Sequence, residues 1–211
     1  NGVTLNSNDY ITVFGDGSLM VDGAGTVVNA GPGFSADLAL GSLGTGNLTI
    51  SNNALVTTTA HPFRVVLGFP VGGTGNLFLN SGGTFAAGTI GIGLGAGSVT
   101  FDGGVFRALV SDADVFRGNF ASGDFTLNAG GGTIDSNGFD ITAGNIIGGA
   151  GSLAKTGLGT VSLTGANAYS GGTYLGGGIL EVSANNNLGD TFGALTFHGG
   201  TLKNSESFFI G

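Results

Sequence analysis

The densest group of charged side chains in the sequence consists of Arg107, Asp112, Asp114 and Arg117. If this segment is extended, Asp112 and Asp114 point to the same side, because alternate residues of a strand share a face. Two carboxylates placed in this way, beside a cation, could perform general acid and base chemistry on an acidic polysaccharide. Local Arg–Asp pairing in a solvated loop explains the same residues without catalysis. We therefore expect a surface contact here rather than a catalytic centre.

Other residues that could bind a metal or attack a substrate are scattered. His61 precedes Pro62, and His198 precedes a Gly-Gly turn, with no second histidine at ligand spacing. The sequence has no cysteine, which excludes disulfides, thiolate catalysis and cysteine-based zinc sites. Most acidic residues are isolated, and several adjoin a glycine, as in ordinary turns. Segment 148–156 lacks the aspartate of a calcium-binding nonapeptide. We expect no cofactor, no metal and no enzymatic activity.

The composition excludes several classes of protein. The chain has 211 residues, of which 46 are Gly and only 3 are Pro, without a collagen period. The hydrophobic fraction of 41% is too high for ordinary disorder, and so many glycines disfavour long helices. Five Lys and Arg residues against thirteen Asp and Glu residues give a net charge of −8, which argues against nucleic acid as a partner. No apolar run is long enough to insert into a membrane.

A short pattern recurs along the chain: small residues and glycine, an apolar–polar–apolar triplet, and a turn that is often Gly-Gly. The first apolar members of these triplets are Leu19, Leu48, Leu77, Val99, Phe125, Val161 and Leu195. A second apolar step follows several of the turns, as in Thr84-Phe85, Val105-Phe106, Thr133-Ile134 and Thr201-Leu202. Alternation of this kind puts the apolar residues of each triplet on one face of a strand. We expect the corresponding members of successive units to stack.

Each unit is too short to bury its own apolar face, so the pattern predicts a β-solenoid in which every coil covers the next. We expect an all-β segment over residues 1–211 with roughly ten coils and irregular loops. Thr, Ser and Asn on the outer face would pair between coils, and glycine would turn the corners. Residues 105–120 are interpreted as a longer excursion with one helical turn. A β-sandwich or closed barrel is the competing architecture.

Residues 155–182, KTGLGTVSLTGANAYSGGTYLGGGILEV, resemble the autotransporter-associated β-strand repeat. The residues that carry the resemblance are Lys155, Gly157, Gly159, Val161, Leu163, Gly165, Asn167, Tyr169, Gly171, Thr173, Leu175, Gly178 and Leu180. Their order and spacing follow the family pattern without a break. The resemblance implies structural roles for them: Asn167 at a corner, Tyr169 over a coil edge with its hydroxyl in water, and Lys155 along the trunk.

The resemblance also implies a fold and a location. Passengers of this family are right-handed parallel β-helices outside a Gram-negative cell, anchored in the outer membrane as full-length proteins. On this basis residues 1–211 are interpreted as a fragment of a longer passenger, which serves as a structural stalk or an adhesive surface. Its expected partner is a host, matrix or cell-surface macromolecule.

Three other functions remain open. The chain could be a filament subunit that associates end to end through the edge at residues 208–211. It could be a polysaccharide lyase or glycosidase built on a β-helix. It could also be a secreted ligand of a host receptor, which the sequence does not separate from an adhesin.

Overall fold

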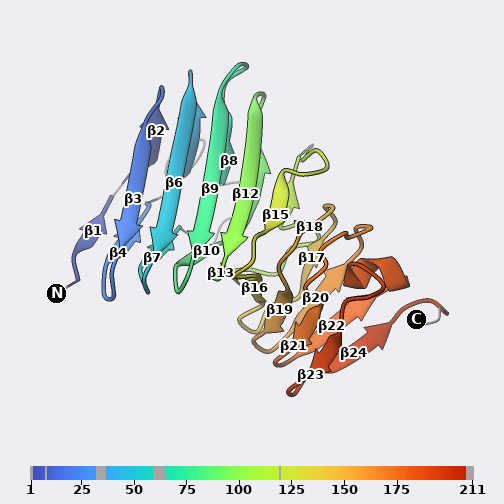
Figure 1. Cartoon of the computed structure of the whole chain (residues 1–211). Coiled ribbons are helices and arrows are strands. Elements are labelled where there is room, and N and C mark those ends of the chain that lie inside the picture. The colour runs from blue at the N-terminus through green and yellow to red at the C-terminus, as the bar shows by residue number, and fades with distance from the viewer. Residues whose placement is uncertain (1, 8, 32–36, 59–64, 119, 208–211) are drawn as a thin grey trace.

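The computed structural model describes residues 2–7, 9–31, 37–58, 65–118 and 120–207. Its strands are short, and almost all pair in parallel with strands one coil away, forming rows that run from the N-terminus to the C-terminus (Figure 1). In these residues the single helical element is a 3-10 turn, η1 (Asn185–Leu188), and no helix could cross a bilayer. The chain is a right-handed parallel β-helix, which confirms the predicted fold class.

One sheet runs the length of the molecule. Sheet A contains, in spatial order, β1 (Thr4–Asn6), β4 (Val27–Asn29), β7 (Leu55–Thr57), β10 (Thr84–Ala87), β13 (Gly104–Ala108), β16 (Gly132–Asp135), β19 (Leu153–Thr156), β21 (Thr173–Leu175) and β23 (Leu195–Phe197). Each coil contributes one strand to this sheet. The nine strands described therefore correspond to nine coils, close to the ten expected.

Two further sheets complete a three-sided cross-section in the first half of the chain. Sheet B contains β2 (Ile11–Phe14), β5 (Leu38–Ser42), β8 (Val65–Leu67), β11 (Ile90–Ile92) and β14 (Phe116–Arg117). Sheet C contains β3 (Ser18–Asp22), β6 (Thr45–Ser51), β9 (Thr74–Asn80), β12 (Ala96–Asp102), β15 (Phe125–Leu127) and β18 (Gly148–Gly149). Coils here are long: Asn47 and Asn76, which bond to each other on adjacent coils, are 29 residues apart.

The cross-section changes in the second half. Sheet D contains β17 (Ile141–Ala143), β20 (Thr160–Leu163), β22 (Ile179–Val182) and β24 (Thr201–Asn204). After β18 each described coil has one strand in sheet A and one in sheet D, and irregular chain forms the third side. Coils shorten accordingly: Ile147 and Asn167 bond across one coil although they are only 20 residues apart.

The core is a set of stacked columns rather than a central cluster. In sheet A the register aligns Leu5, Val28, Val56, Phe85, Phe106, Ile134, Lys155, Leu175 and Phe197. In sheet C it aligns Leu19, Leu48, Leu77, Val99 and Phe125. The second column confirms the predicted stacking for the first five triplets.

The last two triplets do not continue that column. Val161 lies in sheet D, where it pairs with Ile141 and Leu180, and Leu195 lies in sheet A beside Thr173. Alternating apolar residues identify a strand, but they do not say which side of the coil the strand occupies. The prediction of one continuous series was therefore wrong beyond Phe125, where the chain leaves the three-sided cross-section.

The expected excursion at residues 105–120 was also wrong. Its described part forms β13 and β14, joined by irregular chain that includes one bridge from Asp112 to Ile141, with no helical turn among residues 105–118. Phe106 and Phe116 point into the core, with their ring centroids 5.0 Å apart, and Phe116 packs on Phe125 at 4.5 Å. Burial of these rings holds the segment in the regular coil path, because large aromatic side chains dominate core energetics.

Polar residues on the outer face of sheet C pair between coils as predicted. The amide of Asn76 donates to Asn47 Oδ1 at 3.0 Å, and Ser98 Oγ donates to Asn76 Oδ1 at 2.8 Å. At the corners, Gly82 and Gly103 have φ values of 74° and 89°, a region that glycine enters at little cost. These contacts fix the register of each coil on the next.

We expect Phe106→Ala to lower the free energy of unfolding by about 3–5 kcal/mol, because it removes a fully buried ring from the stacked column. Val105→Ala, at the neighbouring outward position, should cost less than about 1 kcal/mol. Urea unfolding followed by circular dichroism measures both. Equal effects of the two variants would contradict the columnar core.

Candidate functional site

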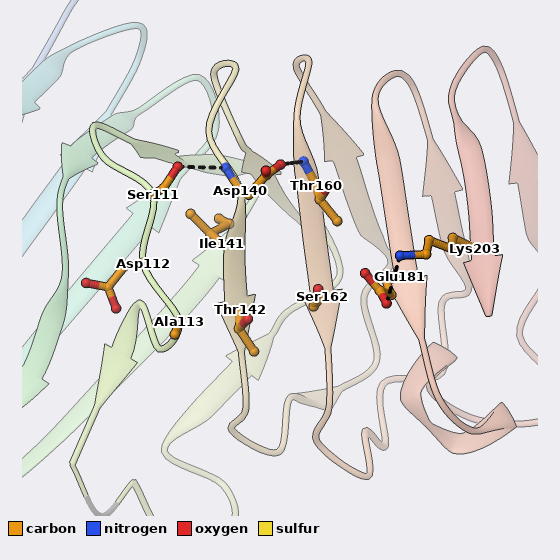
Figure 2. Close-up of a pocket in the computed structure, with 10 residues that line it drawn as sticks. All are labelled: Ser111, Asp112, Ala113, Asp140, Ile141, Thr142, Thr160, Ser162, Glu181 and Lys203. Atoms are coloured by element: carbon orange, nitrogen blue, oxygen red, sulfur yellow. Dashed lines mark hydrogen bonds and ion pairs between the residues drawn. The ribbon is translucent and has the colours of Figure 1, made fainter. Parts of the chain in front are cut away.

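An open groove crosses the outer face of sheet D (Figure 2). Its volume is about 490 Å³, and it is lined by Ser111, Asp112, Ala113, Asp140, Ile141, Thr142, Thr160, Ser162, Glu181 and Lys203. Thr142, Ser162, Glu181 and Lys203 occupy matching positions on β17, β20, β22 and β24. Their neighbours in each strand point inward, so the strand alternation sets these side chains in a row across four coils.

The groove carries more negative than positive charge. Asp112, Asp140 and Glu181 line it together with one cation, Lys203, whose Nζ lies 3.2 Å from Glu181 Oε1. Asp140 Oδ1 accepts the backbone N–H of Thr160 at 2.7 Å, and this hydrogen bond holds the pKa of Asp140 below its ordinary value. Ser111 Oγ accepts the backbone N–H of Asp140 at 3.1 Å. The coils on either side thus fix Asp140 from both directions.

The structure brings together three of the four charged residues singled out in the sequence. Arg117 binds both carboxylate oxygens of Asp112, at 2.8 and 2.7 Å, and the backbone N–H of Asp114 donates to Asp112 Oδ1 at 2.9 Å. Arg107 lies apart on sheet A, where its Nε donates to Asp135 Oδ2 at 2.8 Å. Asp112 forms an isolated parallel bridge with Ile141 of sheet D, whereas Asp114 lies in irregular chain two residues further on. The two carboxylates line different hollows.

Asp114 lines a second hollow of about 360 Å³, which shares Ala113 and Thr142 with the groove and ends at Asn145 and Thr164. Burial raises the pKa of Asp114, while the nearby Arg117 guanidinium opposes that rise. We call the groove and this hollow together the sheet D trough. Most of its polar atoms are hydroxyl and carboxylate oxygens.

Sequence reasoning did not find Asp140, Ser162, Glu181 or Lys203, because they come from separate coils and form no local motif. The signal that could have found them is the coil length of about 20 residues, which places Thr142, Ser162 and Glu181 in register.

The two histidines are further candidate metal ligands in the sequence. His198 stacks on Tyr174 in sheet A, with ring centroids 5.2 Å apart, and His61 lies outside the described residues. Across the residues described, no three His, Cys, Asp or Glu side chains gather as a metal site would require.

Lys155 of the repeat points into the core, although the sequence reading laid it along the trunk. Its side chain is only 1% exposed, in the sheet A column between Ile134 and Leu175. Its Nζ donates to Ser136 Oγ at 2.8 Å and to the carbonyl oxygens of Thr156 and Gly157 at 2.9 and 2.8 Å. Burial lowers the pKa of Lys155 to about 8.

Tyr169 is likewise buried, so the expectation of a wet hydroxyl at a coil edge was wrong. Its hydroxyl is 2.7 Å from Thr173 Oγ1, which in turn donates to the carbonyl of Leu188 at 3.0 Å. Burial raises the pKa of Tyr169 to about 12. The residue fills the interior where the two-sheet coils lack a third strand.

Asn167 connects three coils through its side-chain amide. Its Oδ1 accepts the backbone N–H of Ile147 at 2.9 Å, and its Nδ2 donates to the carbonyl of Asn187 at 2.7 Å. The amide adds to the backbone hydrogen bonds on this side of the coil, such as that from Ala168 N–H to the Ile147 carbonyl at 2.8 Å.

The other repeat residues face the core or turn the chain. Val161, Leu163, Leu175 and Leu180 are buried, and Gly157, Gly159 and Gly178 have positive φ. Gly165 and Gly171 lie against the backbone of the preceding coil, where a Cβ atom would collide with Asn145 and Gly151.

Comparison with known proteins agrees with this geometry. Residues 153–182 match the model of the passenger-associated-transport-repeat family. Over 82 residues the chain is 37% identical to a protein named adhesin BmaC autotransporter, from Brucella suis biovar 1 (strain 1330). The aligned part covers 39% of this chain and 2% of that adhesin. No solved structure matches. The chain thus carries an autotransporter passenger repeat, and its location is the cell surface or exterior of a Gram-negative bacterium.

The buried lysine generates a prediction on pH. The pKa of Lys155 is about 8 in the folded chain and near 10.4 in an unfolded one, so between these values only the unfolded chain holds the proton. The free energy of unfolding should therefore rise with pH through this window, by about 3 kcal/mol in total. Lys155→Met should flatten the profile between about pH 7.5 and 9.5, as measured by urea unfolding.

Lys203→Met, which removes a half-exposed lysine, serves as the control and should keep the parent's slope. The measurements stop at about pH 9.5 because Tyr169 has a raised pKa in the folded chain. Above about pH 10 it would ionise first in the unfolded chain, which favours unfolding. A parent profile that is flat from about pH 7.5 to 9.5 would contradict the neutral buried lysine.

Proposed function

We propose that this chain, which contains a passenger-associated transport repeat, is a stiff spacer at the bacterial surface whose sheet D trough is an adhesive face. The stacked columns make the spacer stiff, because each coil is held by burial on both sides and by a ladder of parallel hydrogen bonds. Its partner would be a host, matrix or cell-surface macromolecule.

The observation that carries the proposal is the open, polar trough built from rigid strands. Outward Thr142, Ser162 and Glu181 are separated by single coil steps, and their hydroxyl and carboxylate oxygens face solvent along the groove. A broad surface of this kind can make many modest contacts with a macromolecule without a deep pocket. Sites placed on strands are also held more precisely than sites on loops.

Charge favours contact over cleavage of an acidic polysaccharide. Asp112 accepts two hydrogen bonds from the Arg117 guanidinium, and Glu181 is paired with Lys203. Asp140 adds a further negative charge, so the trough as a whole would repel an acidic glycan. The word adhesin in the name of the Brucella relative supports the adhesive role, although the aligned part is a small share of that protein.

Ser162→Arg should reduce binding to the partner at least about tenfold, because the long side chain fills the middle of the groove. The assay measures binding of the purified chain to cultured epithelial cells and to a panel of immobilised matrix proteins. Thr100→Arg makes the same change at an outward position of β12, on sheet C, and should bind as the parent does.

If the parent chain binds neither cells nor matrix proteins, the proposal of an adhesive face is wrong and only the spacer role is left. Equal loss in both variants would place the adhesive surface elsewhere. Circular dichroism of both variants checks that each remains folded.

A further inference from the structure

Large apolar side chains are exposed at four successive corners between sheet B and sheet C, at the last residue of β2 or in the turns that follow β5, β8 and β11. They are Phe14, Leu43, Phe69, Val71 and Leu94, with exposed fractions of 63%, 63%, 47%, 73% and 67%. These turns lie one behind another at the upper ends of β3, β6, β9 and β12 (Figure 1). We call the five side chains the corner ridge.

Hydrogen bonds between the turns show that the ridge is continuous. Gly15 N–H donates to the Ser42 carbonyl at 2.9 Å, Thr74 N–H to Gly44 at 2.8 Å, and Ala96 N–H to Gly73 at 2.9 Å. Each turn therefore sits directly on the one before it. The backbones of successive turns are thus one strand spacing apart, about 4.8 Å.

Two features separate this ridge from incidental exposure. In the next coil the aromatic residue at the same corner, Phe120, packs inward against Phe125, with ring centroids 5.8 Å apart. Leu43 stands at φ 61°, a left-handed conformation that strongly favours Gly or Asn over a bulky residue. The chain thus keeps a leucine where a small polar residue would fit the backbone better.

The ridge is also uncharged apart from Asp16, whose carboxylate accepts the backbone N–H of Thr45 at 2.9 Å. No lysine or arginine lies in the four turns, residues 15–17, 43–44, 68–73 and 93–95. With a net charge of −8 on the chain, nothing here attracts an anionic membrane. An apolar partner surface with the same repeat is the better match.

We propose that the corner ridge binds the corner ridge of a second copy of this chain, side by side and antiparallel. A two-fold axis makes one patch its own complement, and a second copy supplies a row of tips at an identical spacing. Five side chains exposing roughly 100 Å² each give about 500 Å² per copy, or about 1,000 Å² in total. That area lies at the lower limit for a specific interface and corresponds to weak, reversible association.

This inference goes beyond the adhesive role of the sheet D trough, since it uses other residues on earlier coils. Sedimentation velocity of the parent chain from about 5 µM to 1 mM should show a concentration-dependent monomer–dimer equilibrium. The double variant Leu43→Asn and Leu94→Ser should raise the dissociation constant at least about tenfold. The first change suits the left-handed backbone at residue 43, so folding is preserved.

Leu158→Ser is the matched control, because Leu158 is 76% exposed at a different corner, between β19 and β20. It should leave the dissociation constant unchanged. A parent that stays monomeric at about 1 mM overturns the proposal, and so does a dimer that both variants retain, since association would then use the coil ends. Cosedimentation of the parent with phosphatidylcholine vesicles, lost in the double variant, would reassign the ridge to a membrane.

Disulfide cross-linking tests the orientation of the two copies. The chain has no cysteine of its own, so only introduced cysteines can react. Antiparallel pairing sets Phe14 of one copy opposite Leu94 of the other. A mixture of the variants Phe14→Cys and Leu94→Cys should form the mixed disulfide faster than either variant forms its own homodimer. Faster homodimer formation by each variant would overturn the antiparallel arrangement.

Discussion

The burial of each coil's apolar side chains by the next coil is the interaction on which this molecule depends. A coil of 20 to 29 residues has no core of its own, and the column from Val28 through Phe85 and Phe106 to Leu175 is buried only because neighbours stack in register. Slipping one strand by a single residue would turn this column outward, since side chains alternate. The other interactions of the chain therefore serve mainly to fix the register of each coil on the next.

The two halves of the chain protect that register by different means. In the first half three strands per coil form three ladders, and polar ladders such as Asn47–Asn76–Ser98 add side-chain hydrogen bonds outside. In the second half the third side has no strand, although backbone hydrogen bonds such as that from Ser170 N–H to the Gly149 carbonyl at 3.0 Å still join its coils. There Asn167 supplies hydrogen bonds to two neighbouring coils, and Lys155 satisfies two backbone carbonyls and Ser136. Buried polar side chains thus reinforce the side of the coil that has no strand.

The sequence predicts the fold well and the site poorly, for one physical reason. Alternation around Leu48 and Leu77 is a local property of the chain, so it identifies strands and their stacking directly. The side of the coil on which a strand lies depends on turn geometry elsewhere, so Val161 was assigned to the wrong column. Burial of Lys155 and Tyr169 depends on the same long-range geometry, because a lysine or tyrosine in an alternating pattern suits either face. Asp140, Glu181 and Lys203 become a site only through a register that no local pattern contains.

A β-helix whose inward side chains all pack against neighbouring coils has little room for an enclosed pocket, because each inward position contributes to the core. Function is thereby pushed to the outward positions and the corners, where a substitution does not disturb the columns. The sheet D trough uses outward strand positions of the two-sheet coils, and the corner ridge uses turns of the three-sided coils. The two surfaces share no residue, although the coil that carries Leu94 stacks on the coil that carries Asp112 and Asp114, through β11 and β14. On the two proposals made above, cohesion between copies and contact with a partner use different side chains of one scaffold.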